Sequence, residues 1–215
     1  MKFYDCRPAP SPRRVRICLA EKGLDIPVVD IDLTGGEHLG QDFRRISPQC
    51  TVPVLETREG VHLTETAAIY RYLEEVAPEP PLMGETPLEK ALVIEWDHRT
   101  EIEGFMAVAE AFRNQSPHFK TRAIPGPVNY PQVAELSERG RKRTAAFLDT
   151  LNDRLSQCRY LAGDNYTVAD ISALVAVDFA GWIKIPMPES HQHLKRWHAD
   201  VSARPPVRAA TPPRP

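Results

Sequence analysis

The sequence predicts a small α/β domain followed by an all-helical domain, and two observations on the spacing of apolar residues lead to that prediction. Over residues 1–78, short β-forming runs alternate with helical patterns in the order β-α-β-α-β-β-α. Beyond residue 78 the strand patterns stop, and apolar residues recur at helical spacing over long stretches. A chain of 215 residues is long enough to form two such domains.

The first domain is expected to cover residues 1–78. β-branched and aromatic residues cluster between turn formers in its predicted strands, at 2–6, 26–33, 52–57 and 61–63. Its helical patterns lie at 15–23, 41–46 and 66–76. Gly23 is expected to end the first of these helices.

The helical domain is expected over residues 88–204, after a proline-rich linker at 79–87. Helical patterns cover 87–112, 133–155 and 193–201, and a further helix begins at Thr167, where Asp170 predicts a capping box. Residues 116–131 are rich in turn formers and predict a loop. Five of the residues in 205–215 are proline, so we expect a disordered tail there.

Composition and charge exclude several classes of protein. A formal net charge of −2 gives no general attraction to nucleic acid. No apolar run approaches the roughly 18 residues that a membrane span requires, so no membrane association is expected. Basic residues are scattered apart from one run, Arg13-Arg14-Val15-Arg16, which we interpret as a solvated face of the first helix.

The cysteine pattern argues against a metal site. Cysteines are widely spaced, with no Cys-x-x-Cys pair and no histidines at metal-binding distance along the chain, at Cys6, Cys18, Cys50 and Cys158. Such thiols suit a reducing compartment, and the N-terminus enters a strand directly without an apolar signal segment. We therefore predict a cytoplasmic protein without a metal cofactor.

The most informative stretch begins at Val52 and Pro53 and continues to Glu65 and Thr66. Proline cannot donate a ladder hydrogen bond, so Pro53 at the start of a β run leaves the main chain of Val52 free for a ligand. Glu65 and Thr66 open an amphipathic helix, and the N-terminus of a helix attracts a carboxylate. Together these features predict a site for a small acidic peptide.

Five motifs, in this order, resemble those of the cytosolic glutathione transferases. The resemblance covers residue 1 to about residue 204, and it is closest to the theta, delta and related bacterial branches. It implies a thioredoxin-like N-terminal domain and an all-helical C-terminal domain. The motifs are Leu19-Ala20-Glu21-Lys22-Gly23, Gly36-Glu37-His38-Leu39, Ser47-Pro48-Gln49-Cys50-Thr51-Val52-Pro53, Leu63-Thr64-Glu65-Thr66 and Leu161-Ala162-Gly163-Asp164-Asn165-Tyr166-Thr167-Val168-Ala169-Asp170.

The resemblance implies how glutathione, the co-substrate, would lie. Val52 would pair its main chain with the cysteinyl unit, before a cis peptide bond to Pro53. Glu65 would bind the γ-glutamyl ammonium, while Thr66 and the start of its helix would bind the neighbouring carboxylate. If these residues are purely structural, Pro53 merely starts a strand, and Thr64 or Thr66 is a helix N-cap.

Fewer residues of the expected kind are available to bind the glycyl end of glutathione. His38 matches a histidine that reaches the glycyl carboxylate in the family, although a lone histidine in a glycine-rich loop is often just solvated. Thr51 belongs to the same end of the site but stands where many relatives have lysine. Cys50 stands where related sequences often have histidine, and it can be a small buried apolar residue instead.

Three alternatives remain open for the group that stabilises the glutathione thiolate. A serine before a proline does this in the related branches, but counting without gaps puts Ala9-Pro10 in that position. A shift of two residues gives Ser11 before Pro12, which we expect to be the thiol donor; alternatively, Ser11 is an ordinary N-cap. Cys6 is a second candidate nucleophile, and main-chain N–H groups with the helix dipole are the third possibility.

The family resemblance implies an acceptor pocket between the domains, with Trp96, Arg99 and Phe105 on the long helix as candidates. It also implies a homodimer that conjugates the glutathione thiolate to small electrophilic, apolar compounds. We expect this transferase activity. The alternatives are a glutathione-dependent thiol reductase, peroxidase or lyase using Cys6, and a glutathione-binding module with little turnover.

Overall fold

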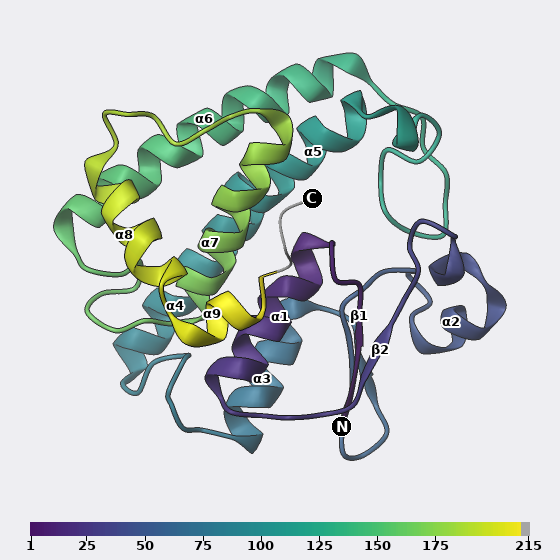
Figure 1. Cartoon of the computed structure of the whole chain (residues 1–215), viewed down its shortest axis with the longest axis horizontal. Coiled ribbons are helices and arrows are strands. Elements are labelled where there is room, and N and C mark those ends of the chain that lie inside the picture. Colours follow the sequence, from purple (N-terminus) through teal and green to yellow (C-terminus); the bar gives the residue numbers. More distant parts are fainter. Residues whose placement is uncertain (212–215) are drawn as a thin grey trace.

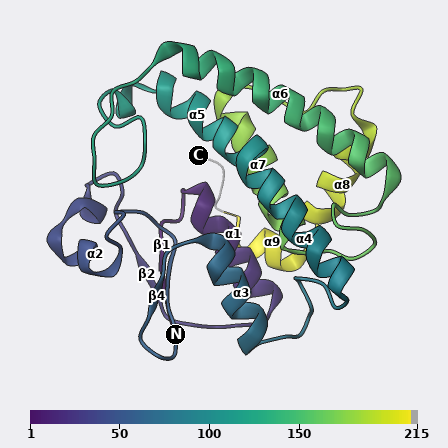
Figure 2. The same ribbon diagram turned by 180° about the vertical axis from the view of Figure 1, so that it is seen from behind.

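The computed structural model describes residues 1–211 and has the predicted architecture, a small sheet with flanking helices followed by a mostly helical domain (Figures 1 and 2). The N-terminal elements are β1 (Lys2–Asp5), α1 (Pro10–Glu21), β2 (Val28–Asp30), η1 (Glu37–Leu39), α2 (Gln41–Ile46), β3 (Val54–Glu56), β4 (His62–Leu63) and α3 (Thr66–Val76). The helical elements are α4 (Pro87–Arg99), η2 (Thr100–Phe105), α5 (Met106–Gln115), η3 (Pro117–Phe119), α6 (Ala134–Gln157), α7 (Val168–Ala180), η4 (Gly181–Ile183), α8 (Gln192–Ser202) and α9 (Pro205–Ala209).

The sheet brings three chain segments to one edge. Its strand order is β2-β1-β3-β4, with β1 parallel to β2 and antiparallel to β3, which is in turn antiparallel to β4. Tyr4 lies opposite Val54, and Leu55 lies opposite Leu63. Because antiparallel neighbours run in opposite directions, the end of β1, the start of β3 and the end of β4 meet at the same edge.

Helix α7 forms the centre of the helical domain. Almost every residue of it is buried, as expected for a helix that is apolar on all sides. It contacts α4, α5, α8 and η2, and it also packs against α1 of the N-terminal domain. One continuous apolar core therefore joins the two halves of the chain, from Phe3 in the sheet to Trp197 in α8. No helix within residues 1–211 is long and apolar enough to cross a membrane.

The predicted 87–112 helix is not continuous. A π-helical segment, η2, separates α4 from α5. It contains Gly104, where an added Cβ would lie 2.4 Å from Cε1 of Phe147 on α6. Residue 104 therefore has no room for a side chain, and the close approach of α6 explains a glycine at this point.

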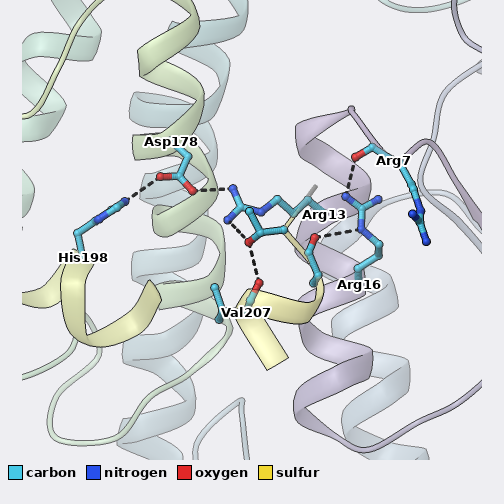
Figure 3. A network of polar contacts seen from close by, with 8 residues as sticks. Arg7, Arg13, Arg16, Asp178, His198 and Val207 are labelled. Atoms are coloured by element: carbon cyan, nitrogen blue, oxygen red, sulfur yellow. Dashed lines mark hydrogen bonds and ion pairs between the residues drawn. The ribbon is translucent and has the colours of Figure 1, made fainter. Parts of the chain in front are cut away.

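The basic run in α1 is not a solvated face, so that interpretation is wrong. Arg13 donates to Asp178 of α7 at 2.6 Å and to the hydroxyl of Thr211 at 3.0 Å, and Asp178 also contacts His198 of α8 (Figure 3). Arg16 pairs with Asp5 at the end of β1. The run therefore pairs with acids on both sides of α1, in the sheet and in the helical domain.

The prediction of a disordered tail over 205–215 is also wrong for its first part. Pro205–Ala209 form helix α9, which starts at two prolines and packs its buried Val207 against the rest of the protein. Before α9, Arg204 donates two hydrogen bonds to Glu21 of α1, at 2.6 and 2.7 Å. Residues 212–215 of the predicted tail lie outside the described part of the chain.

Candidate functional site

The Val52–Pro53 peptide bond is cis, as predicted. Pro53 is buried and Val54 begins the pairing of β3 with β1, so the ladder starts one residue after the proline. Within residues 1–211, the main chain of Val52 makes no hydrogen bond to another protein group. Its N–H and C=O are therefore available to an extended ligand that lies along this edge.

The start of α3 lies beside this strand. Glu65 occupies the N-cap position without a capping hydrogen bond from its side chain, and it is exposed. Thr66, the first helical residue, is 8% exposed. Neither Thr64 nor Thr66 is the N-cap, so that structural alternative is wrong. Among residues 1–211, no side chain accepts a capping hydrogen bond from the first main-chain N–H groups of α3, so they can receive a carboxylate.

The start of α1 faces the start of α3. Helix α1 begins at Pro10 with Ala9 as N-cap, so the count without gaps gives the correct helix start. Ser11 is inside the first turn and is not an N-cap, which makes that alternative wrong. Its Oγ lies 3.5 Å from Oγ1 of Thr66. Pro10 and Pro12 carry no N–H, so Ser11 is the only main-chain donor among the first three helical residues.

Arg14 is a buried cation at this place that sequence reasoning missed. Its side chain is 5% exposed, and it pairs with Glu101 in η2. Its Nη2 donates to the hydroxyl of Ser11 at 2.9 Å, and its guanidinium lies 4.2 Å from the ring centroid of Phe105. The spacing from Ser11 to Arg14 puts both residues on one face of the helix, which is the signal that could have found it.

The hydrogen bond from Arg14 leaves the Ser11 hydroxyl able to donate its own proton. A hydroxyl has one O–H donor and two acceptor positions, and Arg14 fills one acceptor position. The proton of Ser11 is then free to be donated to a neighbouring anion. A hydroxyl polarised by a buried guanidinium is a stronger donor than one in water.

Cys6 lies at the end of β1, near the same edge, but its thiol is poorly suited to nucleophilic attack. It is buried, and burial raises the pKa of the Cys6 thiol above its ordinary value. Hydrogen bonds from the main chain of Ala9 and Leu33 lower the same pKa, but to a smaller extent. Since the thiolate is the reactive form, a raised pKa leaves little nucleophile at neutral pH.

The segment before Val52 is held by its own hydrogen bonds. The hydroxyl of Ser47 accepts from the N–H of Thr51 at 3.3 Å and donates to its carbonyl at 3.1 Å. Cys50 is buried and has a φ of 55°, a left-handed conformation that is uncommon for residues other than glycine. Neither Cys50 nor Thr51 brings a positive charge to this end of the site.

His38 lies in η1, the short helix before α2. Its Nδ1 is buried without a hydrogen-bond partner among the described residues. Burial lowers the pKa of His38, and the charges of Arg122 and Arg113 lower it further. Arg113 lies on α5 and Arg122 in the loop that follows it, so this part of the helical domain acts electrostatically on His38.

The structure does not bring together the three residues predicted for the acceptor pocket. Phe105 stacks with Arg14 and packs 5.6 Å from Phe179, so it lies beside Ser11 at the domain boundary. Trp96 lies instead between the guanidinium groups of Arg99 and Arg154, each about 5 Å from its ring. Nine residues separate Trp96 from Phe105, a distance of roughly 13 Å along a helix.

No group of three or more metal-ligating side chains occurs within residues 1–211. The same part of the chain holds all four cysteines as free thiols.

Comparisons with known proteins agree with this geometry. The model of the glutathione S-transferase N-terminal domain matches residues 9–76, and that of the C-terminal domain matches residues 104–205. Glutathione S-transferase 2 of Saccharomyces cerevisiae is 33% identical over 97% of this chain and 88% of the relative.

Solved structures are similar over the whole chain. The crystal structure of a glutathione S-transferase domain-containing protein from Marinobacter aquaeolei VT8 has a TM-score of 0.88 at 36% identity, covering 96% of this chain and 100% of that one. The crystal structure of Gtt2 from Saccharomyces cerevisiae has a TM-score of 0.89 at 33% identity, covering 98% of this chain and 100% of the other.

Proposed function

The chain belongs to the glutathione transferase family, and on that premise we propose that it binds glutathione at the sheet edge between α1 and α3. The γ-glutamyl carboxylate would dock on the start of α3 at Thr66, with the ammonium on Glu65. The cysteinyl unit would pair with the main chain of Val52. The observation that carries this proposal is the set of unused main-chain groups at this edge, beside the cis bond to Pro53.

The glutathione thiol would lie between the starts of α1 and α3, close to Ser11. Its free pKa is about 8.5, so a transferase must stabilise the thiolate at neutral pH. Ser11 would donate its O–H to the sulfur, because Arg14 occupies an acceptor position of the same hydroxyl. The guanidinium of Arg14, paired with Glu101, would hold the Ser11 hydroxyl in position for this bond. The thiolate would then attack an electrophilic carbon of the acceptor, forming a thioether while the bond to a leaving group such as a halide breaks and that group departs with the electron pair.

The acceptor would lie against Phe105 on the helical side of the boundary. Phe105, Phe179, Phe112 and Trp182 form a continuous series of aromatic contacts with ring centroids 5.2 to 5.7 Å apart. Trp182 is 49% exposed, so the series runs from the buried boundary to the surface. Aromatic side chains of this kind suit an apolar acceptor.

A Ser11→Ala variant tests the thiol-activating role. We expect conjugation of a generic aryl halide to slow by about tenfold to a hundredfold, because a hydrogen bond to a charged group is lost. The ultraviolet absorbance of the bound thiolate, titrated against pH, should show a raised pKa of the glutathione thiol. A Cys6→Ser variant is the matched control and should conjugate at the wild-type rate. Full activity of Ser11→Ala would remove Ser11 from the mechanism.

The Cys6→Ser variant also distinguishes the proposed transferase from a thiol reductase. If Cys6→Ser abolishes thiol-disulfide exchange while conjugation persists, Cys6 has a catalytic role in a second reaction. Retention of the wild-type protein on immobilised glutathione without any conjugation would favour a binding module and contradict the proposed transferase.

A homodimer is part of the proposal. Large apolar side chains are exposed along α4, η2 and α5, at Leu88, Ile94, Ile102 and Met106. A second copy that covers them would remove this surface from water. Sedimentation equilibrium should give twice the monomer mass of 24.2 kDa, and a monomer at micromolar concentration would contradict the proposal.

A further inference from the structure

The loop between α5 and α6 reaches from the helical domain down to the N-terminal domain. In both views it descends toward the segment around η1 and α2 (Figures 1 and 2). At its tip, a Cβ added to Gly126 would lie 4.0 Å from the carbonyl oxygen of Gln49. Gln49 precedes Cys50, Thr51 and Val52, so the loop lies beside the segment that leads into the proposed glutathione site.

Two arginines hold this loop in shape. Arg122 donates to the side-chain oxygen of Asn129 at 2.6 Å and to the carbonyl of Gly126 at 2.7 Å. Arg113, on α5, donates to the carbonyls of Ala123 and Arg122, at 3.0 and 2.7 Å. These acceptors fix both guanidinium groups in place but neutralise neither, because they carry no net charge.

The guanidinium groups of Arg113 and Arg122 interact electrostatically, and that of Arg113 also lies 4.0 Å from the ring centroid of Phe119. Neither has a carboxylate within salt-bridge distance among residues 1–211. Burial lowers the pKa of Arg113 to about 10, and the charge of Arg122 adds to this effect. Like charges in a partly buried place are costly unless an anion joins them, so this arrangement favours anion binding.

His38 belongs to the same group of side chains. Both arginines act on it electrostatically, and its buried Nδ1 has no protein partner in the described chain. One acid, Asp32, also lies near His38, but its Oδ1 already accepts from the N–H of Gly35 at 2.8 Å. The balance of charge here is positive, at the end of the site where Cys50 and Thr51 bring none.

We infer that Arg122, together with Arg113 and His38, binds the glycyl carboxylate of glutathione, so that a loop of the helical domain completes the tripeptide site. The inference rests on the proposed function. It makes Arg122 a specificity-determining residue, which distinguishes glutathione from γ-glutamylcysteine, the dipeptide without the glycyl unit.

Titration calorimetry with the full-length protein tests the inference. Wild type should bind glutathione about tenfold to a hundredfold more tightly than γ-glutamylcysteine, the range expected for hydrogen bonds to a charged group. Arg122→Met should remove most of this preference by weakening glutathione alone. Lys120→Met is the matched control, because Lys120 is an exposed cation on the same loop, and it should keep the preference.

A second measurement needs no variant that could unfold the loop. Glutathione amidated at its glycyl carboxylate keeps the whole tripeptide but loses the charge. Wild type should bind this amide as weakly as it binds γ-glutamylcysteine. Equal affinity for the amide and for glutathione would overturn the inference, and so would a preference that survives Arg122→Met or an equal loss for both peptides. Failure of wild type to bind any of the three ligands would instead overturn the proposed function.

Discussion

The starts of α3 and α7 carry similar residues but differ in what meets their main-chain donors. At α7, the hydroxyl of Thr167 and the carboxylate of Asp170 form a complete capping box within the protein. At α3, Glu65 is the N-cap and Thr66 the first helical residue, and no side chain among residues 1–211 caps the helix. One helix start is closed and buried, whereas the other is open at the sheet edge.

The comparison separates a folding role from a binding role. Asp170 accepts hydrogen bonds from the N–H of Leu161, from Thr167 and from the indole of Trp197, so it ties together three segments of the helical domain. Glu65 makes no such bond and is exposed. A closed helix start contributes to stability, and an open one leaves donors for a ligand.

The largest expected effect is on stability, at Asp170. Asp170→Ala leaves buried donors on Leu161, Thr167 and Trp197 without a partner, and should cost about 3–5 kcal/mol of the free energy of unfolding. Urea denaturation measures this loss. Thr86→Ala, in the exposed capping box of α4, is the matched control and should cost about 1 kcal/mol. Equal losses in the two variants would contradict the special role of the buried box.

A smaller effect concerns the pH dependence of stability. Burial raises the pKa of Asp170 to about 6, whereas an unfolded aspartate has a pKa of about 3.9. The folded state therefore binds the proton more tightly, and the stability that this contributes is complete only well below the unfolded pKa of about 3.9 and is lost as the pH rises through 6. Asp170→Asn should remove about 2 kcal/mol of the difference in unfolding free energy between pH 4 and pH 7. Identical pH profiles for wild type and variant would contradict this.

At the start of α3 we expect the reverse of α7, a loss of glutathione affinity with little change in stability. Glu65→Gln should weaken glutathione by about tenfold to a hundredfold, because the ammonium loses a charged partner. The free energy of unfolding should change by less than about 0.5 kcal/mol, since Glu65 is exposed and caps nothing. Glu75→Gln, another exposed acid on α3, should leave affinity unchanged. A stability loss without an affinity loss would make Glu65 a structural residue.

Features carried by neighbouring residues were predictable from the sequence. The capping box at Thr167 and Asp170 needs only two residues three positions apart, and it is confirmed. The cis bond before Pro53 followed from a family motif, and it is confirmed as well. The two-domain organisation followed from the change of apolar period near residue 78, because strands and helices bury different faces.

Features that depend on distant partners were not predictable. From the sequence, helix α1 could begin at Pro10 or at Pro12. In the structure it begins at Pro10, directly after a turn in which the N–H of Ala9 donates to the carbonyl of Cys6. Arg13 looked solvated because its partner Asp178 lies 165 residues away. Arg14 is missing from the predicted site for the same reason, since its partner Glu101 lies 87 residues away in the helical domain.

The structure of the complex with glutathione tests the central claim most directly. We expect the γ-glutamyl carboxylate at the start of α3, the cysteinyl main chain paired with Val52, and the sulfur within hydrogen-bond distance of the Ser11 hydroxyl. A tripeptide bound elsewhere on the protein, or a carboxylate that avoids the open end of α3, would contradict it.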